Sequence, residues 1–160
     1  MTHKEYNEIV DKCADDLYRF AMRYTADRQL AQDAVQDGFV VLWEHRSEVD
    51  KEKAKGYLLR VMYRKMVDQH RRTKMQLAKN DELKGDESFS PHLNFDLHDA
   101  LQNAINQLPE QQKVLLLLRD LEGYSYREIA EMTKLSDQQV MVYLYRARVA
   151  MKKLLKDYQL

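Results

Sequence analysis

Glycine and proline are scarce in this chain, which has four glycines and two prolines among its 160 residues. Folds rich in β-strands need frequent turns, and those turns favour Gly and Pro. The chain also lacks an apolar run near the roughly 20 residues that span a bilayer, and its N-terminus is charged, unlike a secretory signal. We therefore expect an all-α protein with long helices, no direct membrane insertion and a cytoplasmic location.

Residues that carry enzyme chemistry are also few or badly spaced. The single cysteine, Cys13, excludes an intramolecular disulfide framework and any CxxC metal site. The five histidines show no HExxH or paired-ligand spacing, and the sequence contains no GxxxxGK[ST] loop and no GxSxG elbow. We expect no catalytic residue, no metal and no cofactor, which makes an enzyme the weakest interpretation.

The net charge is zero, with 26 basic and 26 acidic residues, but the charges are unevenly placed. Residues 1–50 carry a net charge of −5, whereas residues 51–75 contain nine basic and two acidic side chains, a net charge of +7. A second basic run, 146–156, contains five cations and no acid. Such runs are either solvated helix faces or surfaces for a polyanion, and the total charge does not decide between them.

Apolar residues at steps of three and four predict amphipathic helices over 6–24, 28–46 and 54–74, with Asp27 as the cap of the second. Leu30 is among the residues expected on the buried side of that helix. The segment 76–95 shows no sustained helical period and contains Gly, Pro, Ser and acidic residues. We expect two small helical domains, 1–75 and 96–160, joined by a flexible linker over 76–95.

Two sequences of the form S-x-x-E/Q, Ser125–Glu128 and Ser136–Gln139, fit capping boxes and begin 11 residues apart. They predict a short helix over 126–132, a turn over 133–135 and a longer helix after it, which is a helix-turn-helix. In the longer helix a line of four side chains lies opposite the core and would face a DNA major groove. These side chains are Gln138, Val142, Tyr145 and Val149, flanked by Gln139 and Arg146.

The basic helix over 54–74 interleaves aromatic residues with its cations. Tyr57 and Tyr63 lie among the basic side chains. Cations follow phosphates, and aromatic rings stack on exposed bases. This composition favours a nucleic-acid surface over a solvated face with half-buried tyrosines.

The two modules, in this order, resemble extracytoplasmic-function sigma factors, the two-domain bacterial initiation factors that recruit core RNA polymerase to promoters. The most specific blocks are AVQDGFVVLW, LPEQQKVLLLLRDLEGYSYREIA and LYRARVAMKKL. The resemblance extends over nearly the whole chain except the linker. It implies a protein that binds the clamp and flap surfaces of core RNA polymerase, promoter DNA and an anti-sigma factor.

The resemblance also assigns roles to residues. It implies polymerase binding by Asp33, Gln36, Asp37, Val40 and Trp43. It implies opening and holding of the −10 strand by Lys53, Lys55, Tyr57, Arg60, Arg64, Asp68, Arg71 and Arg72. It implies −35 recognition by Gln138, Gln139, Val142, Tyr143 and Arg146.

This chain departs from the family pattern at three places. Arg64 stands where relatives usually have Asn, and Lys134 stands in the turn where they usually have Gly. A positive φ at Lys134 would cost about 1 kcal/mol. The third place is the recognition helix, where Met141, Val142 and Tyr143 replace polar residues and leave fewer hydrogen-bond donors for bases.

Two other functions fit parts of the pattern. One is an adaptor on the same scaffold that holds polymerase or a regulator without specific −35 recognition, which the apolar residues of the last helix favour. The other is a dimeric helix-turn-helix repressor, which would need a dimerisation helix or an effector pocket. The sequence shows neither of these features.

Overall fold

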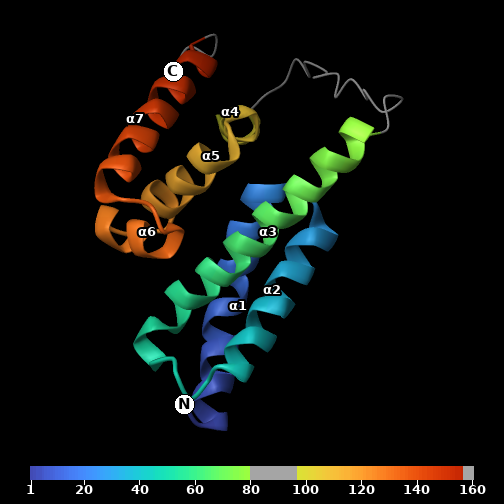
Figure 1. The fold of residues 1–160 in the computed structure, drawn as a ribbon, viewed down its shortest axis with the longest axis vertical. Helices are drawn as coiled ribbons and strands as arrows, with labels where there is room; N and C mark the ends of the chain where they lie inside the picture. Colours follow the sequence, from blue (N-terminus) through green and yellow to red (C-terminus); the bar gives the residue numbers. More distant parts are fainter. Residues whose placement is uncertain (80–96, 157–160) are drawn as a thin grey trace.

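The computed structural model describes residues 1–79 and 97–156, and in these two ranges it contains helices and no strand (Figure 1). The N-terminal unit consists of α1 (His3–Thr25), α2 (Arg28–Glu44), the 3₁₀ turn η1 (Lys51–Lys53) and α3 (Ala54–Lys79). The C-terminal unit consists of α4 (Leu97–Gln107), α5 (Glu110–Leu116), the π-helical turn η2 (Leu117–Leu121), α6 (Tyr126–Thr133) and α7 (Asp137–Leu154). The all-α prediction is confirmed.

Side-chain caps start the helices where the sequence predicts them. The carboxylate of Asp27 accepts hydrogen bonds from the backbone N–H groups of Gln29 and Leu30 at the start of α2. The hydroxyl of Ser125 accepts from the N–H of Glu128 and starts α6. These caps occupy backbone donors that have no partner within a helix.

The three long helices of the N-terminal unit pack against one another around large apolar side chains, which include Leu17, Phe20, Leu42, Leu58 and Met62. Gly38 allows α2 and α3 to approach closely, because a Cβ atom there would lie 3.2 Å from Cγ of Met62. Cys13 is a buried member of this core, as expected.

One expected core residue is misplaced. Leu30, predicted on the buried side of α2, is exposed, and Ala31 takes the buried position instead. The reason is the helical period, because Ala31 lies on the same face as the buried Ala34, Val35 and Gly38.

The two units pack against each other along α1 and α3 (Figure 1). Helix α6 contacts α3, while α4 and η2 contact α1. One hydrophobic cluster contains buried residues of both units, from Leu17 and Leu59 to Leu118 and Ile129. The cores are therefore continuous across the boundary between the units.

Helix α3 ends at Lys79, beyond the expected end near residue 74. Residues 76–79 of the expected linker consequently belong to a helix, and residues 80–95 lie outside the described part of the chain. The last turns of α3 are composed of Met, Gln, Leu, Ala and Lys, which are all good helix formers, so propensity sustains the helix after its apolar stripe has ended.

Candidate protein and nucleic-acid interfaces

The outer face of α2 carries four of the five residues expected to bind a protein partner. Asp33, Gln36 and Val40 are exposed, and Val40 leaves 55% of its surface in solvent. Asp37 is half-buried and pairs with the ammonium group of Lys65 on α3. The face therefore combines an exposed apolar side chain with carboxylates, one of which is oriented by a neighbouring helix.

Trp43, the fifth residue, is packed within the unit. Its ring lies 4.6 Å from the ring of His3 and 4.9 Å from that of Tyr6, and the guanidinium of Arg46 stacks 4.0 Å from its centroid. Arg46 also donates a hydrogen bond to the carbonyl oxygen of Trp43. Trp43 therefore joins the start of α1 to the end of α2, and only part of its ring remains available to a partner.

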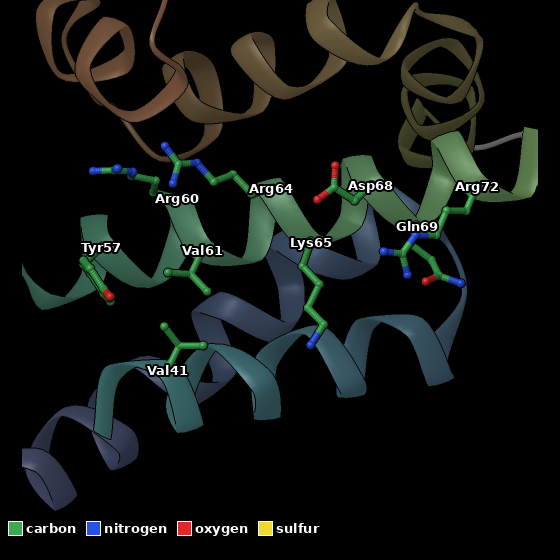
Figure 2. A pocket seen from close by; sticks show the side chains of 9 residues that line it. All are labelled: Val41, Tyr57, Arg60, Val61, Arg64, Lys65, Asp68, Gln69 and Arg72. Carbon is green, nitrogen blue, oxygen red and sulfur yellow. The ribbon is translucent and has the colours of Figure 1, made fainter. Parts of the chain in front are cut away.

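A pocket of about 470 Å³ lies between α2 and α3, and Figure 2 shows the side chains around it. Lys65 points across the pocket toward α2, and Val41 faces Val61. Nine side chains line it: Val41, Tyr57, Arg60, Val61, Arg64, Lys65, Asp68, Gln69 and Arg72. Five of them are expected −10 residues, so the structure brings together most of the set that the resemblance assigns. Val41, Val61, Lys65 and Gln69 complete the pocket without having been predicted for it.

Most cations of α3 lack an acidic partner. In the described ranges no carboxylate lies within salt-bridge distance of Arg60, Arg64, Arg71 or Arg72. Arg60 and Arg64 point toward the C-terminal unit, whereas Arg72 lies near the end of the helix (Figure 2). Cations without partners attract phosphates most strongly, because binding breaks no internal ion pair.

Lys55, like Lys65, has acidic partners, and its partners lie in both units. Its ammonium group lies 3.2 Å from a carboxylate oxygen of Asp16 on α1 and 3.2 Å from one of Glu122 after η2. Burial by itself lowers the pKa of Lys55, but the hydrogen bonds and charges of Glu122 and Asp16 outweigh burial and raise the pKa. This expected DNA-binding residue is thus engaged in holding the units together.

Glu110, at the start of α5, forms a second polar contact between the units. One of its carboxylate oxygens accepts a hydrogen bond from the hydroxyl of Tyr24 at 3.1 Å and lies 3.0 Å from Nδ1 of His70. The ammonium group of Lys113 lies 4.8 Å from the centre of the Tyr24 ring. Burial, followed by the charge of Glu110, raises the pKa of Tyr24, and burial lowers the pKa of Lys113.

The helix-turn-helix forms as the capping residues predict. Ser136 starts α7 with a complete capping box, in which its hydroxyl accepts from the N–H of Gln139 and its own N–H donates to Oε1 of Gln139. Lys134 ends α6 with φ 59°, in the left-handed region that favours glycine. The turn therefore carries the strain expected of a lysine at this position.

The outer face of α7 places four of the five expected −35 residues in solvent: Gln138, Gln139, Val142 and Arg146. Tyr143 is half-buried against the core, with Arg146 5.9 Å from its ring centre. Gln139 is exposed, but its side-chain oxygen is already bound in the capping box, so only its amide nitrogen is free to donate. Gln139 is therefore a capping residue as well as an expected DNA contact, and much of the Tyr143 side chain is packed against the core.

Neither described range contains a group of three or more His, Cys, Asp or Glu side chains that could hold a metal ion. None of the helices in those ranges is long and apolar enough to cross a membrane.

Two models of protein families match the chain, one for each helical unit. The model described as Sigma-70 region 2 matches residues 9–75, and the model described as Sigma-70, region 4 matches residues 98–151. The first match contains the expected polymerase-binding and −10 residues, and the second contains the helix-turn-helix.

Individual proteins are similar over most of the chain. The extracytoplasmic-function sigma factor SigM of Bacillus subtilis is 28% identical over 92% of this chain and 93% of its own length. The sigma factor SigV of the same organism is 30% identical over 82% of this chain and 80% of its own length. Among solved structures, the sigma factor RpoE bound to the anti-sigma factor NepR, from Bartonella quintana, superposes with a TM-score of 0.79 at 21% identity, covering 98% of this chain and 99% of that one. CnrH bound to the cytosolic domain of CnrY superposes with a TM-score of 0.72 at 20% identity, covering 99% and 92%.

Proposed function

The chain belongs to the extracytoplasmic-function family of RNA polymerase sigma factors, and we propose how its residues divide the work of directing polymerase to promoters. Residues 1–75 bind core polymerase and the −10 region, residues 96–160 bind the −35 region, and 76–95 connect them. The matched ranges 9–75 and 98–151 support this division. The observation that carries it is the presence of two separate candidate DNA surfaces, one on α3 and one on α7.

Core polymerase binds the outer face of α2 in this proposal. Asp33, Gln36 and Val40 are exposed to a partner, Asp33 accepts a hydrogen bond from the side chain of Gln29, and Asp37 is oriented by Lys65. An exposed apolar side chain surrounded by polar groups is a common composition for a protein interface. Trp43 contributes the exposed part of its ring and fixes the end of α2.

The pocket between α2 and α3 holds the opened −10 strand. Arg60, Arg64 and Arg72 neutralise phosphates, and Tyr57 offers an aromatic ring to an unstacked base. Lys53 in η1 and Arg71 in α3 extend this surface beyond the pocket, and Asp68 lines the pocket itself. Strand opening costs unstacking energy, which the captured bases and phosphate contacts offset. Lys55 joins this surface when the two units separate from their present contact.

Helix α7 enters the major groove of the −35 element. Gln138, Val142 and Arg146 face the DNA, Gln139 donates from its free amide nitrogen, and Tyr143 supports Arg146 from the core side. The capped N-terminus of α7 is directed at a phosphate. The chemistry of RNA synthesis belongs to the polymerase, so the chain itself is not an enzyme, and it acts in the cytoplasm where the chromosome is.

An anti-sigma factor is a further partner. The RpoE structure contains the anti-sigma factor NepR. The similar fold of this chain supports the same kind of regulation here, through a protein whose identity the chain does not specify.

A polymerase-binding adaptor is the second candidate function. Met141, Val142 and Val149 favour it because they expose apolar surface on α7. Transcription from a double-stranded promoter fragment with purified core polymerase separates the two. We expect transcripts that start at defined sites only when the chain is present. Binding to core polymerase without such transcripts would support the adaptor.

A further inference from the structure

The outward face of α7 has few hydrogen-bond groups for reading bases. Of its amides, Gln139 has its oxygen bound to the backbone N–H of Ser136 at 2.9 Å. That bond uses one of the two lone pairs of the oxygen and holds the amide against the backbone of Ser136, so the paired contact to adenine, which needs the oxygen and the nitrogen together, competes with the cap. Tyr143 is half-buried against the core. Gln138 is left as the one free amide on the face of α7 that the structure describes.

Apolar side chains occupy the rest of that face. The exposed fractions are 54% for Met141, 45% for Val142, 70% for Tyr145 and 50% for Val149. Val142, Tyr145 and Val149 follow Gln138 along the line opposite the buried Val140, Leu144 and Ala147. Gln138 and Val149 lie 11 residue steps apart, or about 16 Å along the helix, which corresponds to about five base pairs of B-DNA.

The charges around this apolar line favour DNA over protein as its occupant. Arg146 and Lys153 lie on one side of the line and Lys152 lies on the other, and the sequence has no acid between residues 146 and 156. Cations on both sides of a ridge formed by a single helix match the two phosphate backbones that border a major groove. Helix α7 also lies at the edge of the molecule, away from α1 and α3 (Figure 1).

We propose that α7 selects its promoter element mainly by apolar contact with thymine methyl groups. Val142 and Tyr145 supply the central contacts, Met141 and Val149 extend them, and Gln138 reads one adenine. In the major groove, the C5 methyl of thymine is the one apolar group among the base-pair edges, and it is the natural partner for these side chains. The selected element is rich in A·T pairs. This inference rests on the proposed −35 role of α7.

The test replaces thymine by uracil, which removes the methyl group and leaves base pairing intact. The preferred −35 element is first selected from a randomised double-stranded library with the full chain bound to core polymerase. Each thymine of that element is then changed to uracil in turn, with uracil in the spacer between the two elements as a control. We expect about fourfold weaker binding for each contacted methyl group, the loss that follows from about 0.8 kcal/mol per buried carbon, and no effect of uracil in the spacer.

Single substitutions in the chain test which side chain contacts the methyl group whose removal weakens binding. Val142→Ala should lose the sensitivity to uracil at the one thymine that Val142 contacts, because that methyl group has lost its partner, and it should keep the sensitivity at the other thymines. Leu97→Ala removes an exposed apolar side chain from α4 of the same unit, and it should keep the full sensitivity to uracil.

The outcomes separate this inference from the proposed function. A clear sequence preference that no uracil substitution changes, or that lacks thymine, would overturn methyl recognition while leaving the −35 role in place. If the selected library shows no sequence preference, both methyl recognition and the −35 role of α7 are overturned. A third outcome is that Val142→Asp no longer binds core polymerase and that uracil has no effect on binding by the parent chain. This outcome would assign the apolar line to a protein partner instead.

Discussion

The two candidate DNA surfaces use opposite chemistry. Helix α3 presents arginines without acidic partners beside an aromatic ring and a pocket, whereas α7 presents an apolar line with cations only at its sides. A cationic surface provides affinity that depends on salt and little on sequence, while groove contacts provide discrimination. We therefore propose that the N-terminal unit supplies most of the affinity for promoter DNA and that the C-terminal unit supplies most of the sequence discrimination.

The largest effect is expected on the outer face of α2, which belongs to neither of the two candidate DNA surfaces. Asp37→Lys should abolish binding to core polymerase, because it reverses a charge on the α2 face and places two ammonium groups together at Lys65. The measurement is co-elution with core polymerase during gel filtration. Glu44→Lys makes the same charge change at an exposed position of α2 outside the predicted set, and it should still co-elute. Retention of core binding by Asp37→Lys would remove α2 from the interface.

A sequence-specific effect is expected from α7. Gln138→Ala should relax preference at one base pair, and a good base contact provides about 1–3 kcal/mol of discrimination. Gln139→Glu keeps an oxygen for the capping box, loses the free donor and adds a negative charge that weakens binding to every sequence. The base preference is therefore compared instead of the affinity, and we expect the preference to change less. Selection from a randomised −35 library by the holoenzyme measures both. A stronger effect of Gln139→Glu than of Gln138→Ala would show that the assignment of these two residues is reversed.

A smaller and sequence-independent effect is expected from α3. Arg71→Ala and Arg72→Ala should each lower the salt slope of promoter binding by about 0.9, which is about a 3.5-fold change between 50 and 200 mM salt. Arg148→Ala is a matched control, since Arg148 pairs with Asp120 at 3.0 Å and should contribute less. Binding titrations at several salt concentrations provide the slopes. An unchanged salt slope in both variants would contradict phosphate binding by Arg71 and Arg72.

The smallest functional effect is expected in the turn between α6 and α7. Lys134→Gly should raise the free energy of unfolding by about 1 kcal/mol, because glycine adopts a positive φ without strain. Lys134→Ala keeps a Cβ atom and should bring no comparable gain. Urea denaturation measures both, and promoter preference should remain that of the parent. A loss of stability in the glycine variant would contradict the strain assigned to this residue.

Local structure could be predicted well from the sequence, because it depends on residues near one another. The cap at Asp27, both serine caps of the helix-turn-helix and the positive φ at Lys134 follow from side-chain chemistry over a few positions. Helix α3 extends beyond the last residue of its apolar period, because the residues that follow have a high intrinsic helix propensity.

Contacts between the two units could not be predicted in the same way. Lys55 reaches Glu122, and Tyr24 and His70 meet at Glu110, through the docking of two surfaces that are far apart in sequence. The hydrogen bonding of Gln139 was also not fully predictable from the sequence, although the residues involved are close in the chain. Its spacing from Ser136 predicts a capping box and its position predicts a DNA contact, and only the geometry shows that its oxygen is already used.

One measurement tests the division of labour between α3 and α7 most directly. Purified chain and core polymerase are combined with a library of genomic fragments, and the start sites of runoff transcripts are mapped. We expect transcripts that depend on the chain and start downstream of two shared elements, with the upstream element lost in the Gln138→Ala, Val142→Ala double variant and the downstream element retained. Transcripts that share no upstream element in the parent chain, or no transcripts above those of core polymerase alone, would contradict the account.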